Sequence, residues 1–396
     1  MINVLLISDY NRPDILRQFI KCNDVFNFSI LYFKDDSFEK NDLPPFKKYY
    51  WNQFSSSYDV LKKLNPKKII LADIESFYEV ALNLACKKKN IPVFLIDHGM
   101  RHKMEIDLAY KFYEKKAVSN VVKKIDSKLS YSSISTIIFT LRSLRLHNFF
   151  KLHKILFFFY IRRKNHLTLA LHKCQYEFRR PNYYLCISEE VNKFYIYRDG
   201  ISKDRIINIG NPDQDTFYNN FADEPINGDH YLLIDSPHLE IDRYQVVRKD
   251  KTNFIHKINQ FCLKKEKKLF IKLHPISYKT DDLVIHSNIV YLRDVKFESF
   301  VNNTIAVFGF ASSLMVPFIY IRKSCLFKLG DWAFQNNVEN IGVCQILDFY
   351  TFTKEDISFN IKTRTNKSLS KFEKMYVYKA DGNSLSRMKK FIIDTL

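Results

Sequence analysis

An aspartate, a histidine and a glycine directly follow one of the apolar runs of the chain. The run covers residues 92–97 (PVFLID), and Asp97, His98 and Gly99 stand at its end. An imidazole exchanges a proton near neutral pH, so His98 could take the proton of an attacking hydroxyl group. Gly99 would allow a sharp turn and the close approach of a substrate. The simpler interpretation is that His98 only completes a turn at the end of a strand.

A second histidine follows another apolar run, residues 268–273 (KLFIKL). Pro275 restricts the backbone after His274, which would present the imidazole at the end of a strand. An imidazolium in that place can bind or protonate a departing phosphate group. A His-Pro pair has little specificity by itself, and its position behind a strand makes the functional interpretation the stronger one.

A glycine and two serines follow a third run, residues 305–308 (IAVF), at the start of a helix expected near residues 312–321. Gly309 ends the run, and Ser312 and Ser313 follow it. Serine at the start of a helix is most often an N-cap. Hydroxyl groups, backbone N–H groups and the positive end of a helix also bind phosphate, and one turn can do both.

Two further places with acidic residues carry weaker signals. Glu298 lies between the His-Pro pair and the two serines, where its carboxylate could accept both hydroxyls of a ribose. Taken alone, it is better explained as a solvated glutamate at the start of a helix. Asp213, Gln214 and Asp215 match the DxD pattern of metal-dependent glycosyltransferases. This triplet follows Gly-Asn-Pro close to a linker, so we interpret it as a turn and expect no metal site.

The elements that must position these residues are strands and helices in alternation. In the first 125 residues, apolar strands are expected at 3–8, 28–33, 68–72 and 92–97, with a helix over 76–89. Two more strands are expected at 183–188 and 206–209, with a helix over 189–198 between them. Continuous apolar runs separated by helices are typical of a buried parallel sheet. The first half is therefore expected to be Rossmann-like.

The second half repeats this alternation after a polar stretch. Strands are expected at 231–235, 268–273, 289–292, 305–308 and 324–328. The predicted division is an N-terminal domain over 1–218, a linker over 219–229 (NNFADEPINGD), a C-terminal domain over 230–382 and a C-terminal helix over 383–396. Two open α/β sheets would face each other across a cleft and bind ligands at the carboxyl ends of their strands.

A basic helical insertion is expected at about 127–180. Residues 127–176 contain no acidic residue, but they hold nine lysines and arginines among many aromatic and aliphatic residues. The apolar run 155–161 (ILFFFYI) is far shorter than the roughly 20 residues that cross a bilayer. Basic and aromatic helices instead suit contact with an anionic membrane surface, here through Arg162, Arg163 and Lys164. Alternatively, the insertion packs on its own domain and its cations face water.

Composition narrows the class of protein. The net charge of +19 favours an anionic partner, although solubility and a lysine-rich composition offer a plainer explanation. The seven cysteines form no CxxC pair, which is typical of reduced thiols in the cytosol without structural zinc. The first residues, MINVLLISDY, lack the pattern of a signal peptide.

A nucleic-acid-binding protein could use the basic aromatic segment, but no recognised module for that task is present.

The order of these short motifs resembles that of the GT-B bacterial sialyltransferases and polysialyltransferases, and of the related capsule Kdo transferases and CDP-glycerol glycerophosphotransferases. The resemblance covers most of the chain outside about 125–180. Its motifs are Asp97-His98-Gly99, Gly210-Asn211-Pro212, His274-Pro275, Phe297-Glu298 and Ser312-Ser313. It implies two Rossmann-like domains in a GT-B arrangement.

For the donor, the resemblance implies that His274 contacts the phosphate of a CMP-linked sugar and assists its departure. Ser312 and Ser313 would bind phosphate oxygens, and Glu298 would hold the ribose. Pro275 and Gly309 would belong to the same nucleotide site.

For the acceptor, the resemblance implies a general base at the second acidic position of the sialyltransferase motif. Here that position is His98, which departs from the pattern. The glycerophosphotransferases have a His-Gly pair at a similar point. Asp97 could orient His98 or act as the base itself, and Gly99 and Arg101 would lie on the acceptor side.

The function we expect is an inverting, metal-independent and cofactor-free transfer of an acidic sugar from a CMP-activated donor. The sugar would be sialic acid, a related nonulosonic acid or Kdo. The acceptor would be a hydroxyl of a bacterial capsule or lipooligosaccharide, reached from the cytoplasmic face of the inner membrane. The alternatives are a CDP-glycerol or CDP-ribitol type polyol-phosphate transferase, and a UDP-sugar transferase or epimerase of the same fold.

Overall fold

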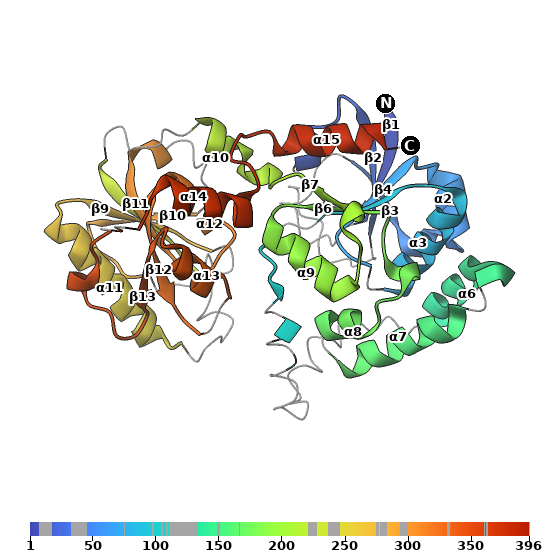
Figure 1. The fold of residues 1–396 in the computed structure, drawn as a ribbon, viewed down its shortest axis with the longest axis horizontal. Coiled ribbons are helices and arrows are strands. Elements are labelled where there is room, and N and C mark those ends of the chain that lie inside the picture. Colours follow the sequence, from blue (N-terminus) through green and yellow to red (C-terminus); the bar gives the residue numbers. More distant parts are fainter. Residues whose placement is uncertain are drawn as a thin grey trace. The chain divides into compact units, whose positions relative to one another are not determined.

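The chain folds into two compact units, each built on a parallel β-sheet (Figure 1). The first unit comprises Met1–Asp213 and Ser384–Leu396, and the second comprises Gln214–Asn383. The computed structural model describes all residues except 8–17, 33–45, 75, 97–98, 104–105, 108–109, 111–133, 149–150, 166, 221–227, 237–245, 275–276, 278–282, 294–299, 331–332, 360, 362 and 396.

The sheet of the first unit has the strand order β3-β2-β1-β4-β5-β6-β7 in the described part of the chain, and every neighbouring pair is parallel. Its strands are β1 (Ile2–Ile7), β2 (Phe26–Tyr32), β3 (Lys47–Tyr50), β4 (Lys68–Leu71), β5 (Val93–Ile96), β6 (Tyr183–Cys186) and β7 (Ile206–Asn208). The central strands β4 and β5 are buried along their whole length, as the continuous apolar runs predict. Parallel pairing places all carboxyl ends at one edge of the sheet.

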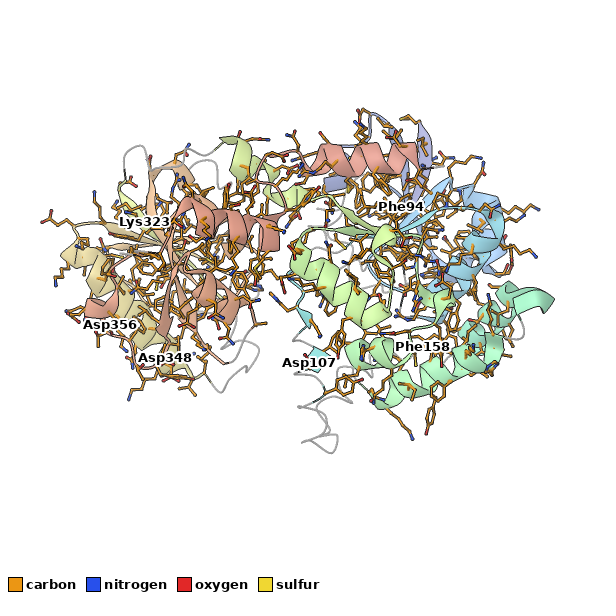
Figure 2. All side chains as sticks on the ribbon, viewed as in Figure 1. Phe94, Asp107, Phe158, Lys323, Asp348 and Asp356 are labelled. Atoms are coloured by element: carbon orange, nitrogen blue, oxygen red, sulfur yellow. The ribbon has the colours of Figure 1, made fainter. Side chains whose placement is uncertain are left out.

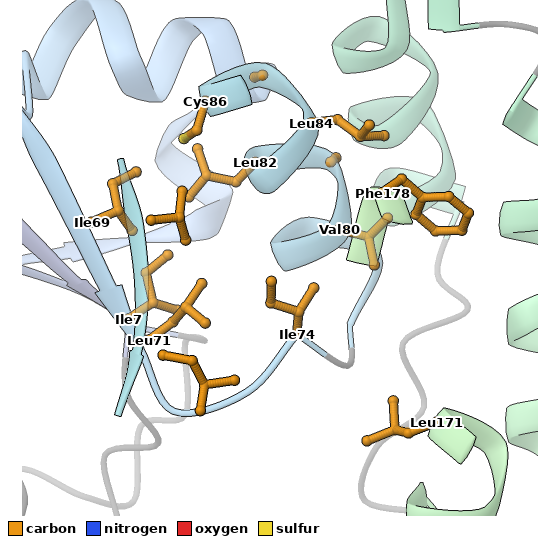
Figure 3. Close-up of a cluster of buried hydrophobic side chains, with 14 of the residues drawn as sticks. Ile7, Ile69, Leu71, Ile74, Val80, Leu82, Leu84, Cys86, Leu171 and Phe178 are labelled. Carbon is orange, nitrogen blue, oxygen red and sulfur yellow. The ribbon is translucent and has the colours of Figure 1, made fainter. Parts of the chain in front are cut away.

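Helices cover both faces of this sheet. They are α2 (Ser57–Leu64), α3 (Phe77–Lys89), α6 (Ile134–Asn148), α7 (Leu152–Lys164), α8 (Leu167–Lys173), α9 (Glu189–Asp199) and α15 (Ser384–Asp394). Helix α3 begins where the sequence predicts, because Ser76 and Glu79 form a reciprocal capping box. Figure 3 shows Leu82 and Cys86 of α3 on the side of the strand residue Ile69, and Leu84 on the side of Phe178.

The basic insertion is an integral part of the first unit. Phe139 of α6 and Phe158 of α7 are buried in the same core as the sheet residues Leu71 and Leu95. The insertion therefore packs on its own domain with one face. Within the part of the chain that the structure describes, no helix combines the length and the apolar character needed to cross a bilayer.

The C-terminal helix α15 also belongs to the first unit and covers the other face of its sheet (Figure 1). Met388 and Ile392 are fully buried there, and Phe391 meets the ring of Phe94 on β5, which Figure 2 labels. Gly210 follows β7 in a left-handed conformation with φ 81°. A Cβ at this position would lie 2.5 Å from the Ser384 hydroxyl oxygen, so the close approach of α15 requires glycine.

In the second unit, the described strands have the order β10-β9-β8-β11-β12-β13, again all parallel. The strands are β8 (His230–Ile234), β9 (Lys268–Lys272), β10 (Ile289–Leu292), β11 (Thr304–Gly309), β12 (Lys323–Lys328) and β13 (Gln345–Asp348). The helices are α10 (Asp215–Asn220), α11 (Arg248–Lys264), α12 (Met315–Ile321), α13 (Ala333–Ile341) and α14 (Asn366–Phe372). Phenylalanines dominate the core, among them Phe254, Phe308 and Phe327.

Short helical turns connect several of these elements. They are the 3-10 turns η1 (Trp51–Gln53), η4 (Glu177–Arg179), η5 (Lys203–Arg205), η6 (Pro212–Gln214), η9 (Val301–Asn303) and η10 (Lys354–Asp356), and the π-turn η11 (Glu373–Val377). The DxD triplet starts in η6, where the Asp213 amide donates to the side chain of Asn211 over 3.1 Å. The turn expected at this triplet is confirmed.

Candidate functional site

His274 and the two serines lie at one edge of one sheet. His274 follows β9 and the serines follow β11, with β8 as the only strand between them in the sheet. Two strand spacings separate the two turns by roughly 10 Å. The Leu273 amide donates to the Leu292 carbonyl over 3.0 Å, which holds the backbone before His274 in the sheet. His274 itself is half-buried. Pro275 and Glu298 lie outside the described residues.

The two serines form a turn that precedes a helix, and the expected helix start at Ser312 is wrong. Helix α12 begins at Met315, and the Ser312 hydroxyl accepts the Leu314 amide over 3.3 Å. The Ser313 carbonyl accepts from the Gln214 side chain over 3.1 Å, which ties the turn to η6, just before α10. The helix starts late because Ser312 closes its own short turn with the backbone two residues ahead.

Gly309 has a steric role in this turn. A Cβ at Gly309 would lie 2.5 Å from the Met315 sulfur, in the first turn of α12. The missing side chain therefore lets β11 and the start of α12 approach each other closely. This contact places the serine turn at the end of β11.

The strand between the two motifs ends in a buried carboxylate that sequence reasoning missed. Asp235 follows β8, and its amide continues the ladder by donating to the Lys272 carbonyl over 3.0 Å. Its carboxylate is 3.2 Å from the Lys251 ammonium on α11. The only hint in the sequence was an acidic residue at the end of an apolar run, between the other two motifs.

Helix α11 begins with an unusual excess of positive charge. Its first four residues are Arg248, Lys249, Asp250 and Lys251, although cations are disfavoured at the positive end of a helix. A crossover helix begins at the carboxyl edge of its sheet, so this charge lies on the side of His274 and the serines. An anion bound at this edge would find both charge and hydrogen-bond donors.

At the corresponding edge of the first sheet, the candidate bases Asp97 and His98 lie outside the described residues. Gly99 is half-buried, and among the described residues beyond its chain neighbours no atom lies within 4 Å of the position a Cβ would take. The guanidinium of Arg101 lies 5.9 Å from the ring centre of Phe194 on α9.

A buried histidine-carboxylate pair follows this motif. His102 lies four positions after His98, and its Nδ1 is 3.5 Å from Oε2 of Glu190 in the first turn of α9. Burial alone would raise the pKa of Glu190, but the contacts with His102 and Lys193 lower it. Glu190 is therefore a carboxylate held against an imidazole. No local sequence pattern predicts this pair, because its members are far apart along the chain.

The other end of α9 is held by a buried network of charges. The carboxylate of Asp199 accepts from Arg179 over 2.7 Å, from Arg198 over 3.0 and 2.9 Å, and from the Tyr184 hydroxyl over 3.1 Å. Arg198 also binds Asp73, just after β4, over 2.8 and 3.3 Å. Burial opposes ionisation of Asp199, but the two guanidiniums hold its pKa well below its usual range.

Cysteine chemistry is not supported. All seven cysteines are free and buried, and burial raises the pKa of Cys22 to about 11 and of Cys262 to about 12. Such thiols remain protonated at neutral pH and are poor nucleophiles. Among the described residues, no group of three or more histidines, cysteines, aspartates or glutamates is arranged to hold a metal ion.

The residues predicted to contact a membrane lie at the end of α7. Arg162 is half-buried and Lys164 is exposed, whereas the side chain of Arg163 lies outside the described ones. The Lys164 ammonium donates to the Tyr160 hydroxyl and lies 4.4 Å from the centre of the Tyr160 ring.

Comparisons with known proteins identify relatives of the chain. The model of the alpha-2,8-polysialyltransferase (POLYST) family matches residues 5–327. The solved structure of the wall teichoic acid polymerase TagF is similar, with a TM-score of 0.52 and 13% identity, over 99% of this chain and 88% of that one. The glycotransferase of kitacinnamycin has a TM-score of 0.52 and 9% identity, over 99% and 98%. Among curated proteins, none matches the sequence significantly. At such low identity, the two structures establish a shared fold.

Proposed function

Because the chain belongs to the alpha-2,8-polysialyltransferase family and is a glycosyltransferase with a GT-B fold, we propose that it transfers an acidic sugar from a CMP-activated donor. The sugar is sialic acid, a related nonulosonic acid or Kdo. The acceptor is a hydroxyl group of a bacterial surface glycan, in a capsule or a lipooligosaccharide. The observation that carries this proposal is that His274 and the Ser312–Ser313 turn lie at the same edge of one sheet.

In the proposed reaction the second unit binds the nucleotide phosphate. His274 donates a hydrogen bond to the phosphate, and the two serines supply hydroxyl and backbone N–H groups. Lys251 donates from the start of α11, where the Asp235 carboxylate lies 3.2 Å from its ammonium, and Arg248 and Lys249 of the same turn add positive charge. Charge that develops on the phosphate as the sugar leaves is met by donors already in place, which lowers the barrier. Glu298 holds the ribose hydroxyls in this scheme.

The acceptor hydroxyl gives its proton to His98 or Asp97 while its oxygen attacks the anomeric carbon of the sugar. The bond from that carbon to the phosphate oxygen breaks, CMP leaves, and the configuration at the anomeric carbon inverts. Gly99 and Arg101 lie on the acceptor side. Neither a metal nor a cofactor takes part in the proposed reaction.

One observation favours a second candidate, a CDP-glycerol or CDP-ribitol type polyol-phosphate transferase. His98 stands where the sialyltransferase motif has an acidic base, and glycerophosphotransferases have a His-Gly pair at a similar point. The same phosphate-binding groups would serve a CDP donor. A UDP-sugar transferase or epimerase would share the fold, but it would act on a UDP-activated sugar and not on a CMP- or CDP-linked donor.

A donor panel tests these possibilities. The full chain is incubated with CMP-, CDP- and UDP-activated donors, with and without a glycan acceptor, and the released nucleotide is quantified. The proposal predicts acceptor-dependent release of CMP from a CMP-linked acidic sugar and none from the others. If CDP-glycerol is the only donor from which CMP is released in an acceptor-dependent way, the chain is a polyol-phosphate transferase and the proposal is wrong.

We further propose that the enzyme is peripheral on the cytoplasmic face of the inner membrane and that the anionic lipid surface is its partner. The basic character of the α7 end supports this, since Arg162, Arg163 and Lys164 follow one another and Lys164 is exposed. Each cation near an anionic bilayer is attracted to it, and the attraction weakens with salt.

A further inference from the structure

Nearly half of the exposed large hydrophobic side chains lie on two consecutive helices of the insertion. Thirteen such side chains are exposed among the described residues, and six of them lie on α6 or α7. Their exposed fractions range from 41% to 53%. We call this set the α6–α7 apolar face; it consists of Ile137, Ile138, Leu141, Leu156, Phe157 and Tyr160. Such a concentration of exposed apolar surface marks an interaction site.

Both helices expose their three residues in the same pattern. The positions are i, i+1 and i+4, which cover an arc of about 100° on a helix. The opposite sides are anchored in the core, because Phe139 of α6 and Phe158 of α7 are buried. Figure 2 labels Phe158. A surface helix normally turns polar residues to water when its other face packs on the core. These two helices have apolar residues on both sides.

The charged residues on these two helices have a single sign. Residues 127–176 contain no aspartate or glutamate, while Arg142 on α6 and Lys154 and Lys164 on α7 are exposed. Lys164 lies over the Tyr160 ring, so its charge is held beside the apolar face. A second copy of the chain would bring equal charges together, which disfavours self-association. An anionic lipid surface offers both an apolar interior and negative charge.

We propose that the α6–α7 apolar face inserts into the boundary between the headgroups and the acyl chains of an anionic membrane. The six side chains enter the apolar layer, while the flanking lysines and arginines bind headgroup phosphates. Interfacial helices insert in this way to a depth of about 5–10 Å. The inference rests on the proposed membrane partner and adds that binding needs apolar insertion and not charge alone.

Vesicle sedimentation with the full chain tests the insertion. Vesicles of phosphatidylcholine alone and with phosphatidylglycerol are compared at about 0.1 M and about 0.5 M salt, because salt screens charge attraction but not insertion. The test variant combines Leu156→Ser, Phe157→Ser and Tyr160→Ser. The matched control combines Val247→Ser and Leu263→Ser, two exposed apolar positions of the second unit. Thermal unfolding verifies that both variants fold.

We expect the wild type and the control to bind anionic vesicles and to keep part of that binding at high salt. The affinity of the α7 variant for anionic vesicles should fall by at least about ten-fold at both salt concentrations, since three inserting side chains are lost. If the wild type and the α7 variant bind equally well and salt abolishes the binding of both, the insertion is refuted. The proposal that the membrane is a partner would still hold in that case. No binding of the wild type to any vesicle would remove the partner as well. A dimer that dissociates in the α7 variant, without vesicle binding, would assign the face to self-association.

Discussion

Asp199 is the centre of the buried network at the end of α9, and the substitution Asp199→Asn removes its charge with little change in shape. The carboxylate balances the guanidiniums of Arg179 and Arg198, and all three side chains are buried. After the substitution, Asp73 is the remaining carboxylate of the network, and it contacts Arg198. Removing one partner of a buried ion pair costs about 3–5 kcal/mol.

This loss should appear as a large drop in the melting temperature of the first unit. For a domain of about 150–250 residues, each kcal/mol shifts the midpoint by about 2–4 °C, so the expected drop is about 6–20 °C. The assay is calorimetric unfolding, in which a transition of the second unit should stay in place. The matched control is Glu189→Gln on the same helix, which breaks an exposed pair with Lys193 and should cost less than about 1 kcal/mol.

The pH dependence gives an independent measure of the same charge. The pKa of Asp199 is lowered in the folded state, so its ionisation stabilises the fold above the ordinary value of 3.8 and this contribution is lost as the pH falls below it. The difference in stability between wild type and Asp199→Asn should therefore shrink on acidification below about pH 4. A variant as stable as the wild type at neutral pH would refute the idea that Asp199 balances the two guanidiniums.

Two further predictions concern the first unit. His102 follows His98 by four positions and is held by Glu190, so we infer that it positions the base. His102→Gln should then lower kcat about ten-fold or more with KM nearly unchanged, and an unchanged kcat would make the pair purely structural. Phe158→Ala should lower the free energy of unfolding of the first unit by about 3–5 kcal/mol, and Phe157→Ala by much less, since only Phe158 is buried. Chemical denaturation measures both values. Equal losses of stability would contradict the burial of Phe158 and the exposure of Phe157.

The fold could be predicted where a strand is buried on both faces. Strands β4, β5 and β11 occur where the apolar runs indicate, because a buried parallel strand is largely apolar. Strand β3 (Lys47–Tyr50) was missed, since it lies at an edge and begins with two lysines that face solvent. The C-terminal helix was expected, but its place on the first sheet depends on contacts such as that of Gly210 with Ser384, which no local pattern reveals.

The site could be predicted in part, for a similar reason. The rule that ligands bind at the carboxyl ends of parallel strands located His274 and the serine turn correctly at one sheet edge. This rule does not point to Lys251, because Lys251 reaches the same edge of the second sheet from the start of helix α11 and not from the end of a strand. It also missed His102 and Glu190, which meet only through the packing of two segments that are distant in the sequence.

The most direct test of the account is single-turnover release of CMP by His274→Ala in the presence of a CMP-linked acidic sugar and an acceptor. The matched control is His256→Ala, which removes an exposed histidine of α11 in the same unit. We expect the His274 variant to keep its thermal unfolding profile and to lose CMP release by about 100-fold or more, as for the loss of a group that acts on the leaving phosphate. The control should release CMP as the wild type does. Wild-type release of CMP by folded His274→Ala would contradict the account.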